Sequence, residues 1–158
     1  IHSLYLFFFF FMIPNLVSFE YNHPGYSKIA REIRYAVFVD EQKVPEELEY
    51  DAHESTARLY LLFIKDTAVA TCRRRYTEKG IKLERFAVLP QFRGKGFGDF
   101  LVREVLKEVL PEGKMIYLHA QEQVTEFYSK LGFKFFGDQF EEAGIRHFLM
   151  KYEVNKSQ

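Results

Sequence analysis

The chain of 158 residues contains one cysteine, no tryptophan and no surplus of charge of either sign. Because Cys72 has no second thiol to pair with, an intramolecular disulfide is excluded, and one cysteine is too few for a cysteine-rich zinc site, so we expect no metal. A lone thiol is typical of a reducing compartment, which predicts a cytoplasmic protein. The 22 basic and 22 acidic residues cancel. Proteins that bind nucleic acid normally carry excess positive charge, so we expect no nucleic-acid partner.

An apolar segment at residues 4–13 includes five consecutive phenylalanines. It is about half as long as the roughly 20 residues that a helix needs to cross a bilayer. It resembles the hydrophobic part of a signal peptide, but no lysine or arginine precedes it and no A-x-A-type cleavage site follows. We expect an extra strand or helix that packs on the body of the protein or on a second subunit of a homodimer. The alternative is an interfacial membrane anchor, although the basic polar face of such helices is missing.

Residues 14–154 are predicted to form one domain, between the apolar extension 1–13 and a polar tail at 155–158, because this length serves a single core. Strand-like and helix-like segments alternate along it, which predicts an α/β fold. Apolar spacing predicts helices at 27–42, 96–110 and 124–131. Strands are predicted at 15–21, 58–65, 68–76, 81–88, 114–120, 133–137 and 146–152. The acidic segment 44–54 is expected to be an irregular loop.

A glycine-rich turn, RGKGFG at 93–98, lies between a predicted strand and a predicted helix. Glycines at the start of a helix let the backbone approach a bound anion, which the free N–H groups and the positive end of the macrodipole attract. Arg93 and Lys95 add positive charge. The turn therefore predicts a pyrophosphate site, with a plain flexible loop as the alternative. Its G-x-G-x-G spacing differs from the G-x-G-x-x-G of dinucleotide folds and from the triphosphatase loop G-x-x-x-x-G-K-[ST].

Two motifs in order point to a family. The pattern Arg93-x-x-Gly96-x-Gly98, just after a strand ending in Ala-Val-x-Pro, resembles the R/Q-x-x-G-x-G/A signature of the GNAT acetyltransferase superfamily. The segment FYSKLGF at 127–133 resembles the family's FYxKxGF. The stretches VFVDEQKVPEELEYD, KLERFAVL, LHAQ and FEEAGIRHFLMK are similar to a small subgroup with the pattern VFVxEQxVPxExExD. Some glucosamine 6-phosphate acetyltransferases of protists also look similar.

This resemblance, which covers about residues 15–152, implies a mixed sheet splayed between strands 81–88 and 114–120, with flanking helices. Acetyl-CoA is the implied cosubstrate, with its pantetheine arm along the backbone of Phe86 and Val88 and its pyrophosphate on the turn. Gln121 replaces the asparagine often found after the second of these strands. The implied cofactor-binding residues are Phe86, Val88, Arg93, Gly94, Lys95, Gly96, Phe97, Gly98 and Gln121.

The implied reaction, acyl transfer to a primary amine, needs a base because an alkylammonium with a pKa of about 10.4 must lose a proton before it attacks. Glu84 is the first candidate for the catalytic base. Its alternative role is an ion pair with Lys82 or Arg85 on the sheet surface. The rival groups, each expected to be structural or substrate-holding, are His119, Glu49, Asp51 and His53.

The departing thiolate, with an ordinary pKa of about 8.5, needs a proton donor. Tyr128 occupies the position of the family's general acid and is the second catalytic candidate. Its alternative role is that of a core aromatic on a short helix, as we expect for Phe127 beside it. Cys72 has no obvious histidine partner, and direct transfer needs no covalent nucleophile, so we expect it to be a small buried hydrophobe.

Three consecutive arginines, Arg73 to Arg75, suggest an anionic acceptor, because the arginine fork suits phosphate. Arg73 and Arg75 share one face of their strand. The leading acceptor is an amino-sugar phosphate such as glucosamine 6-phosphate, with a polyamine or a protein lysine as alternatives. The arginines could instead pair with the acidic loop. For the protein as a whole, the alternative function is a non-catalytic acyl-CoA-binding module with the same fold. The expected substrate-binding residues are Arg73, Arg75, Arg34, Asp51 and His119.

Overall fold

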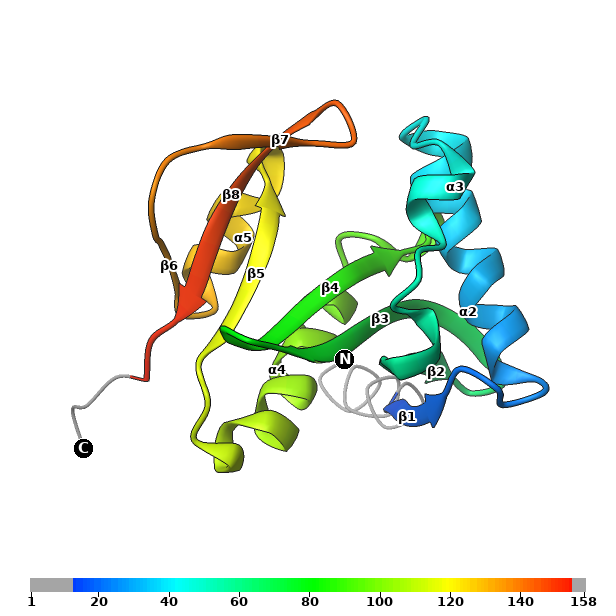
Figure 1. Cartoon of the computed structure of the whole chain (residues 1–158). Coiled ribbons are helices and arrows are strands. Elements are labelled where there is room, and N and C mark those ends of the chain that lie inside the picture. Colours follow the sequence, from blue (N-terminus) through cyan, green and yellow to red (C-terminus); the bar gives the residue numbers. More distant parts are fainter. Residues whose placement is uncertain (1–12, 155–158) are drawn as a thin grey trace, which may run out of the picture.

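The computed structural model describes residues 13–154 (Figure 1). The predicted packing of the apolar extension, apart from Ile13, and the predicted polar tail lie outside the described residues. Within residues 13–154 no helix has both the length and the apolar character needed to cross a membrane.

One mixed sheet of eight strands forms the centre of the fold, in the order β1-β2-β3-β4-β5-β8-β6, with β7 paired to β8 (Figure 1). The strands are β1 (Pro14–Glu20), β2 (Arg58–Ile64), β3 (Thr67–Thr77), β4 (Gly80–Val88), β5 (Ile116–Gln121), β6 (Phe133–Phe135), β7 (Phe140–Glu142) and β8 (Ile145–Tyr152). The β4–β5 pair is parallel, and the other pairs are antiparallel. The predicted mixed α/β sheet with flanking helices is confirmed.

Helices cover both faces of the β1–β4 part of the sheet. Helix α2 (Tyr26–Arg34) packs on one face and α4 (Phe97–Val109) on the other. Alternate residues of β2 point to the two faces of the sheet. Leu61 packs in the apolar cluster under α2, and Leu62 packs in the apolar cluster under α4. Because both faces are covered, the sequence of β2 is a continuous apolar run instead of an alternating one.

The predicted helix at 27–42 is confirmed in extent but differs in type. Its second half, η1 (Tyr35–Glu41), is a π-helix, and the Gln42 N–H donates to the Val37 carbonyl at 3.1 Å. The acidic segment 44–54, expected to be irregular, contains the one-turn helix α3 (Glu46–Glu49) and leads into η2 (Glu54–Thr56). The remaining helical elements are η3 (Pro90–Phe92), η4 (Leu110–Glu112), η5 (Glu122–Val124) and α5 (Thr125–Lys130).

Strand β7 was not predicted from the sequence. It has three residues and pairs with β8 through a tight turn in which Ala143 and Gly144 have φ of +51° and +73°. Turns of this kind are normally signalled by Asn-Gly or Asp-Gly. Alanine rarely adopts positive φ, so Ala143 before Gly144 lacks the usual Asn-Gly or Asp-Gly signal of this turn.

The sheet opens between β4 and β5. Within the described residues their ladder consists of two pairs, Ile81 with Ile116 and Lys82 with Tyr117, after which the strands diverge (Figure 1). On its other edge β4 carries a bulge, since Thr71 pairs with Ala87 but Arg73 pairs with Glu84. Bulges bend a strand and redirect its side chains.

Candidate active site

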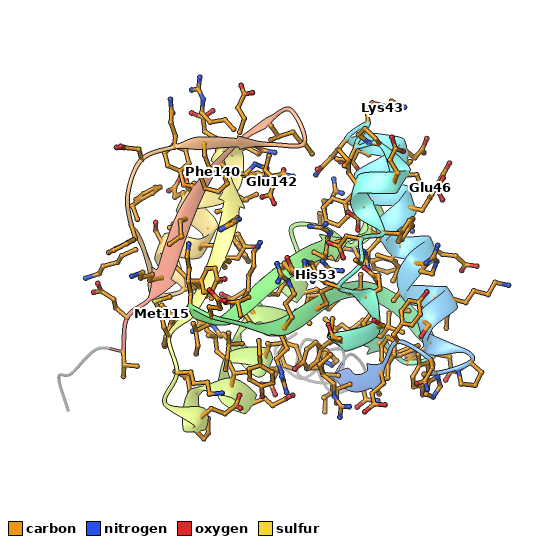
Figure 2. The ribbon with its side chains drawn as sticks, viewed as in Figure 1. Lys43, Glu46, His53, Met115, Phe140 and Glu142 are labelled. Atoms are coloured by element: carbon orange, nitrogen blue, oxygen red, sulfur yellow. The ribbon has the colours of Figure 1, made fainter. Side chains whose placement is uncertain are left out.

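A cleft of about 810 Å³ lies where β4 and β5 diverge. Twelve of the residues expected at the site line it: Asp51, Glu84, Phe86, Val88, Arg93, Gly94, Gly96, Phe97, Gly98, His119, Gln121 and Tyr128. One wall rises from β5 and from Glu142 of β7, and it faces the α3 side across the cleft (Figure 2). The structure therefore brings together residues that are separated by up to 77 positions along the chain from Asp51 to Tyr128.

The glycine-rich turn closes one end of the cleft. Gly94 has φ of +72°, and Gly96, the N-cap of α4, has φ of +84°. A Cβ atom built on either glycine would meet nothing within 4 Å. Glycine is therefore required at both positions by the left-handed backbone, and the space above the turn is open to an anion. Lys95 does not line the cleft, and its ammonium lies 5.7 Å from the centre of the Phe92 ring.

Arg93 is anchored at the edge of the same turn. Its Nε donates to the Val88 carbonyl at 3.0 Å, and its two terminal nitrogens donate to the carboxylate of Glu41 at 2.8 and 2.9 Å. This hydrogen bonding from Arg93 lowers the pKa of Glu41 below its ordinary value. The guanidinium thus already holds an anionic group of the chain where the sequence predicted a pyrophosphate contact.

Gln121 connects the two walls of the cleft. Its side-chain amide donates to Gln42, at the end of η1, at 2.8 Å, and its carbonyl accepts from Gln123 at 2.6 Å. Gln42 was part of the subgroup pattern but was assigned no role from the sequence. Its contact with Gln121 spans 79 positions of sequence, and such a pairing is set by the fold alone.

Tyr128 lies on α5 with its side chain buried against aromatic rings. The ring centres of Phe86, Phe127 and Phe133 lie 6.0, 5.0 and 5.8 Å from that of Tyr128, each in an edge-on arrangement. Burial raises the pKa of the Tyr128 hydroxyl above its ordinary value. The phenol therefore remains protonated at neutral pH, which is the state that a proton donor requires.

Glu84 is surrounded by cations. Its Oε1 accepts hydrogen bonds from Arg73 at 3.1 Å and from Arg75 at 2.5 Å, and Lys82 lies 3.4 Å from Oε2. Burial alone would raise the pKa of Glu84, but these three cations outweigh it and hold the pKa below its ordinary value. Both oxygens of this carboxylate are therefore engaged, and an ionised group with a lowered pKa is a weak base.

The arginines expected to bind a phosphate are instead held in a buried ionic cluster beneath the acidic segment. Arg34 donates to Glu49 at 2.5 Å and to Glu54 at 2.8 and 2.9 Å, with 1% of its side chain exposed. Arg73, equally buried, pairs with Asp51, Glu54 and Glu84. Neither lines the cleft. Their guanidinium groups are occupied by carboxylates, so the arrangement found is ion pairing with the acidic segment, the alternative to a phosphate site.

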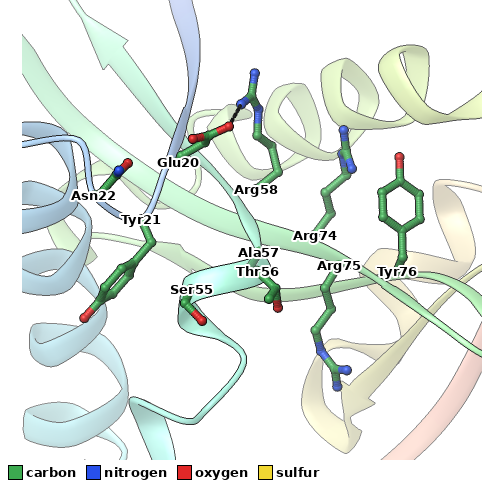
Figure 3. A pocket seen from close by; sticks show the side chains of 10 residues that line it. All are labelled: Glu20, Tyr21, Asn22, Ser55, Thr56, Ala57, Arg58, Arg74, Arg75 and Tyr76. Atoms are coloured by element: carbon green, nitrogen blue, oxygen red, sulfur yellow. Dashed lines mark ion pairs between the residues drawn. The ribbon is translucent and has the colours of Figure 1, made fainter.

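Arg75 also lies outside the cleft. It borders a separate hollow of about 560 Å³ at the far end of β3, together with Arg58 and Arg74 (Figure 3). Arg74 and Arg75 point to opposite sides of the strand (Figure 3), and Arg74 pairs with Glu108 of α4 at 3.0 Å. The predicted alternation of the three arginines is confirmed, but it does not bring Arg75 to the cleft.

The cleft is also lined by three residues to which the sequence assigned no catalytic or binding role, namely Glu142, His147 and Arg85. Two of them, Glu142 and His147, form a group with His119. Glu142 lies 3.4 Å from Nδ1 of His119 and 4.0 Å from Nε2 of His147. The hydrogen bond with His119 lowers the pKa of Glu142 to about 2. The third is Arg85, with φ of +60°, whose guanidinium pairs with Glu49 and Asp51. Glu142 and His147 belong to FEEAGIRHFLMK, a segment similar to the subgroup, but the sequence does not predict β7, so it could not show that the two side chains meet.

Comparison with known proteins adds an independent line of evidence. A family model described as an acetyltransferase (GNAT) domain matches residues 21–154. The protein YyaT of Bacillus subtilis (strain 168) is 35% identical over 135 residues, which cover 81% of this chain and 89% of YyaT. The crystal structure of Escherichia coli ElaA superposes with a TM-score of 0.78 at 25% identity, covering 89% of this chain and 100% of that one. A GNAT family acetyltransferase of Elizabethkingia anophelis, solved with acetyl-CoA bound, superposes with a TM-score of 0.66 at 14% identity, over 89% of this chain and 98% of that one.

Proposed function

Because the chain belongs to the GNAT acetyltransferase family and is therefore an acyltransferase, we propose that it transfers an acetyl group directly from acetyl-CoA to a small primary amine. The observation that carries this proposal is the cleft between the diverging strands β4 and β5, with the glycine-rich turn at one end and Tyr128 in its lining. The same cleft is therefore lined both by the N-terminus of α4, which suits an anion, and by the protonated phenol of Tyr128.

The residues present fit a CoA thioester. The first N–H groups of α4 and the open space above Gly94 and Gly96 suit a pyrophosphate. Beyond Lys82, the edge of β4 that carries Phe86 and Val88 faces the cleft, and an extended amide chain can pair with such an edge. When bound, acetyl-CoA supplies an activated acyl group. The residues of the chain orient that group, accept a proton from the amine and donate a proton to the thiolate.

We assign the general acid to Tyr128. Its hydroxyl is held protonated by burial, and it lines the cleft together with Phe86. A group in this place can protonate a thiolate as the carbon–sulfur bond breaks. Glu84 has a lowered pKa and three cationic partners. In this proposal its carboxylate therefore connects β3 and β4 and is not the catalytic base.

The acceptor is best described as a small primary amine of unspecified further charge. The amino-sugar phosphate expected from the arginines depended on free guanidinium groups, whereas Arg34 and Arg73 already hold carboxylates. The two cations of β4 that line the cleft, Lys82 and Arg85, also have carboxylate partners. Glucosamine 6-phosphate therefore remains a compound to test and has no site of its own in this proposal.

The test is a transfer assay with acetyl-CoA and four amines, namely glucosamine 6-phosphate, glucosamine, spermidine and a lysine peptide. Release of free thiol, checked by mass spectrometry of the acetylated product, measures the reaction. We expect amine-dependent thiol release with at least one small amine. Calorimetric binding of acetyl-CoA without transfer to any of the four would favour the non-catalytic binding module instead. A lower kcat/KM for glucosamine than for glucosamine 6-phosphate would instead indicate a phosphate-binding site for the acceptor.

A further inference from the structure

We propose that His119 is the base that deprotonates the acceptor amine, and that Glu142 of β7 is the positioning residue that orients its imidazole ring. This inference rests on the proposed function and adds the group that accepts the proton. It starts from an arrangement in which one carboxylate oxygen, Oε2 of Glu142, faces His119 of β5 and His147 of β8. All three side chains line the cleft.

The amine needs a base other than Glu84. Oε1 of Glu84 is bonded by two arginines and Oε2 lies beside Lys82. A base must offer a free lone pair within reach of the proton that it takes. Among the histidines and carboxylates of the cleft, the group built round Glu142 is the one in which an imidazole stands beside a carboxylate, an arrangement that makes histidine an effective base.

The distances fix which nitrogen of His119 is the base. Its Nδ1 lies 3.4 Å from Glu142, and an ionised carboxylate only accepts hydrogen bonds, so the proton of a neutral His119 belongs on Nδ1. Nε2 then carries the lone pair. The Phe140 ring, edge-on at 4.8 Å between ring centres, holds the imidazole from the β7 side.

His147 has a different role in the group. Its Nδ1 lies 2.7 Å from the Ile145 carbonyl, so this nitrogen carries the proton and the ring is tied to its own strand. Its Nε2 lies 4.0 Å from Glu142. The charged and titratable groups around His119 are therefore Glu142 on β7, His147 on β8, Tyr117 on its own strand at 6.0 Å between ring centres, and Lys82 on β4, whose charge acts on Glu142.

The ammonium of the acceptor gives one proton to Nε2 of His119, which becomes an imidazolium beside Glu142. The neutral amine forms the nitrogen–carbon bond while the carbon–sulfur bond breaks, and the thiolate takes the proton of Tyr128. The second proton lost by the nitrogen restores Tyr128, and His119 releases its proton to water. One amide, one thiol and one proton result.

The experiment compares His119→Gln, Glu142→Gln, Glu142→Asp and a matched control, His23→Gln, by their kcat and KM with the best amine of the panel. His23 caps the start of α2 through the Tyr26 N–H and lies outside the cleft. We expect His119→Gln to lower kcat/KM by roughly 10²-fold or more, with an unchanged Kd for acetyl-CoA. Glu142→Gln keeps the size of the side chain but removes the carboxylate that holds the proton on Nδ1 of His119, so it should lower kcat severalfold with little change in the KM for the amine, and Glu142→Asp should recover part of the loss. His23→Gln should follow the wild type.

A second readout does not depend on turnover. In NMR spectra at one fixed pH, the imidazole Nδ1 resonance that disappears in His119→Gln should shift in Glu142→Gln, because this nitrogen loses its carboxylate partner, and should stay in place in His23→Gln. An unchanged kcat/KM in His119→Gln, or an unmoved Nδ1 resonance in Glu142→Gln, would overturn this inference while leaving the acetyltransferase in place. If the wild-type protein acetylates none of the amines, the proposed function fails and takes this inference with it.

Discussion

The carboxylate of Glu41 accepts two hydrogen bonds from Arg93, at 2.8 and 2.9 Å, beside the glycine-rich turn. Glu41 is the last residue of the π-helix, and Arg93 precedes the helix on the opposite side of the sheet. Both line the cleft. A planar guanidinium binds a carboxylate and a phosphate with the same two-pronged geometry, so under the proposed function a pyrophosphate on this turn would compete with Glu41 for Arg93.

We expect Glu41→Gln to tighten acetyl-CoA binding, because it removes the anion with which a pyrophosphate on this turn would compete for Arg93. Both side chains are about 40% exposed, and ion pairs of this kind contribute up to about 1 kcal/mol, so the Kd should fall by about twofold to fivefold. Calorimetry measures it. Glu32→Gln, on the exposed side of α2, is the control and should bind as the wild type does. A weaker affinity in Glu41→Gln would mean that Glu41 orients Arg93 for the ligand instead of competing with it.

Gly96→Val tests the turn. Valine in the left-handed conformation is strained by about 1–2 kcal/mol, and relief of that strain would move the first N–H groups of α4 away from a bound anion. Gly113 makes the matched control, because its φ of +66° and its open surroundings are similar but it lies outside the cleft. Both valine variants should lose similar stability, and Gly96→Val alone should raise the Kd for acetyl-CoA severalfold. Equal affinity in the two variants would contradict a pyrophosphate on this turn.

Tyr128→Phe removes the proposed proton donor while it keeps the buried ring. We expect kcat to fall by roughly 10²-fold, with little change in the Kd for acetyl-CoA. Tyr152→Phe, whose ring lies 5.4 Å from Phe133 but outside the cleft, should keep the wild-type kcat. If Tyr128→Phe turned over at the wild-type rate, water or another side chain would have to supply the proton.

Arg34→Met tests whether Arg34 stabilises the fold or binds the acceptor. The change leaves Glu49 and Glu54 buried without this partner, and the loss of one member of a buried ion pair costs about 3–5 kcal/mol. Arg58→Met, which breaks a pair with Glu20 at 3.7 Å on the surface, should cost less than about 1 kcal/mol. Urea unfolding measures both. A near-normal stability of Arg34→Met together with a raised KM for the amine would return Arg34 to the acceptor site.

The sequence predicts best where local physics determines the outcome. The covered strand β2 and the helix α4 follow from their apolar spacing, and the turn at 93–98 follows from glycine's access to left-handed backbone, which Gly94 and Gly96 indeed adopt. The pairing of Arg34 with Glu49 and Glu54 was open to two interpretations, because residues 15 to 20 positions apart meet only through the fold. Glu142 could not be assigned, since its strand has three residues and its turn contains alanine at positive φ.

Because β4 pairs with β5 at two positions and then diverges from it, the rest of this edge of β4 is open to a ligand. The stability of the protein should therefore depend on the concentration of that ligand. A strand edge that faces a cleft carries unpaired backbone N–H and C=O groups. A molecule that forms hydrogen bonds with this edge binds the folded chain and not the unfolded one. By thermodynamic linkage such a ligand adds about 2.7 kcal/mol to the unfolding free energy at 100 times its Kd. If acetyl-CoA is that ligand, the melting temperature and the lifetime of this protein rise and fall with the acetyl-CoA concentration around it.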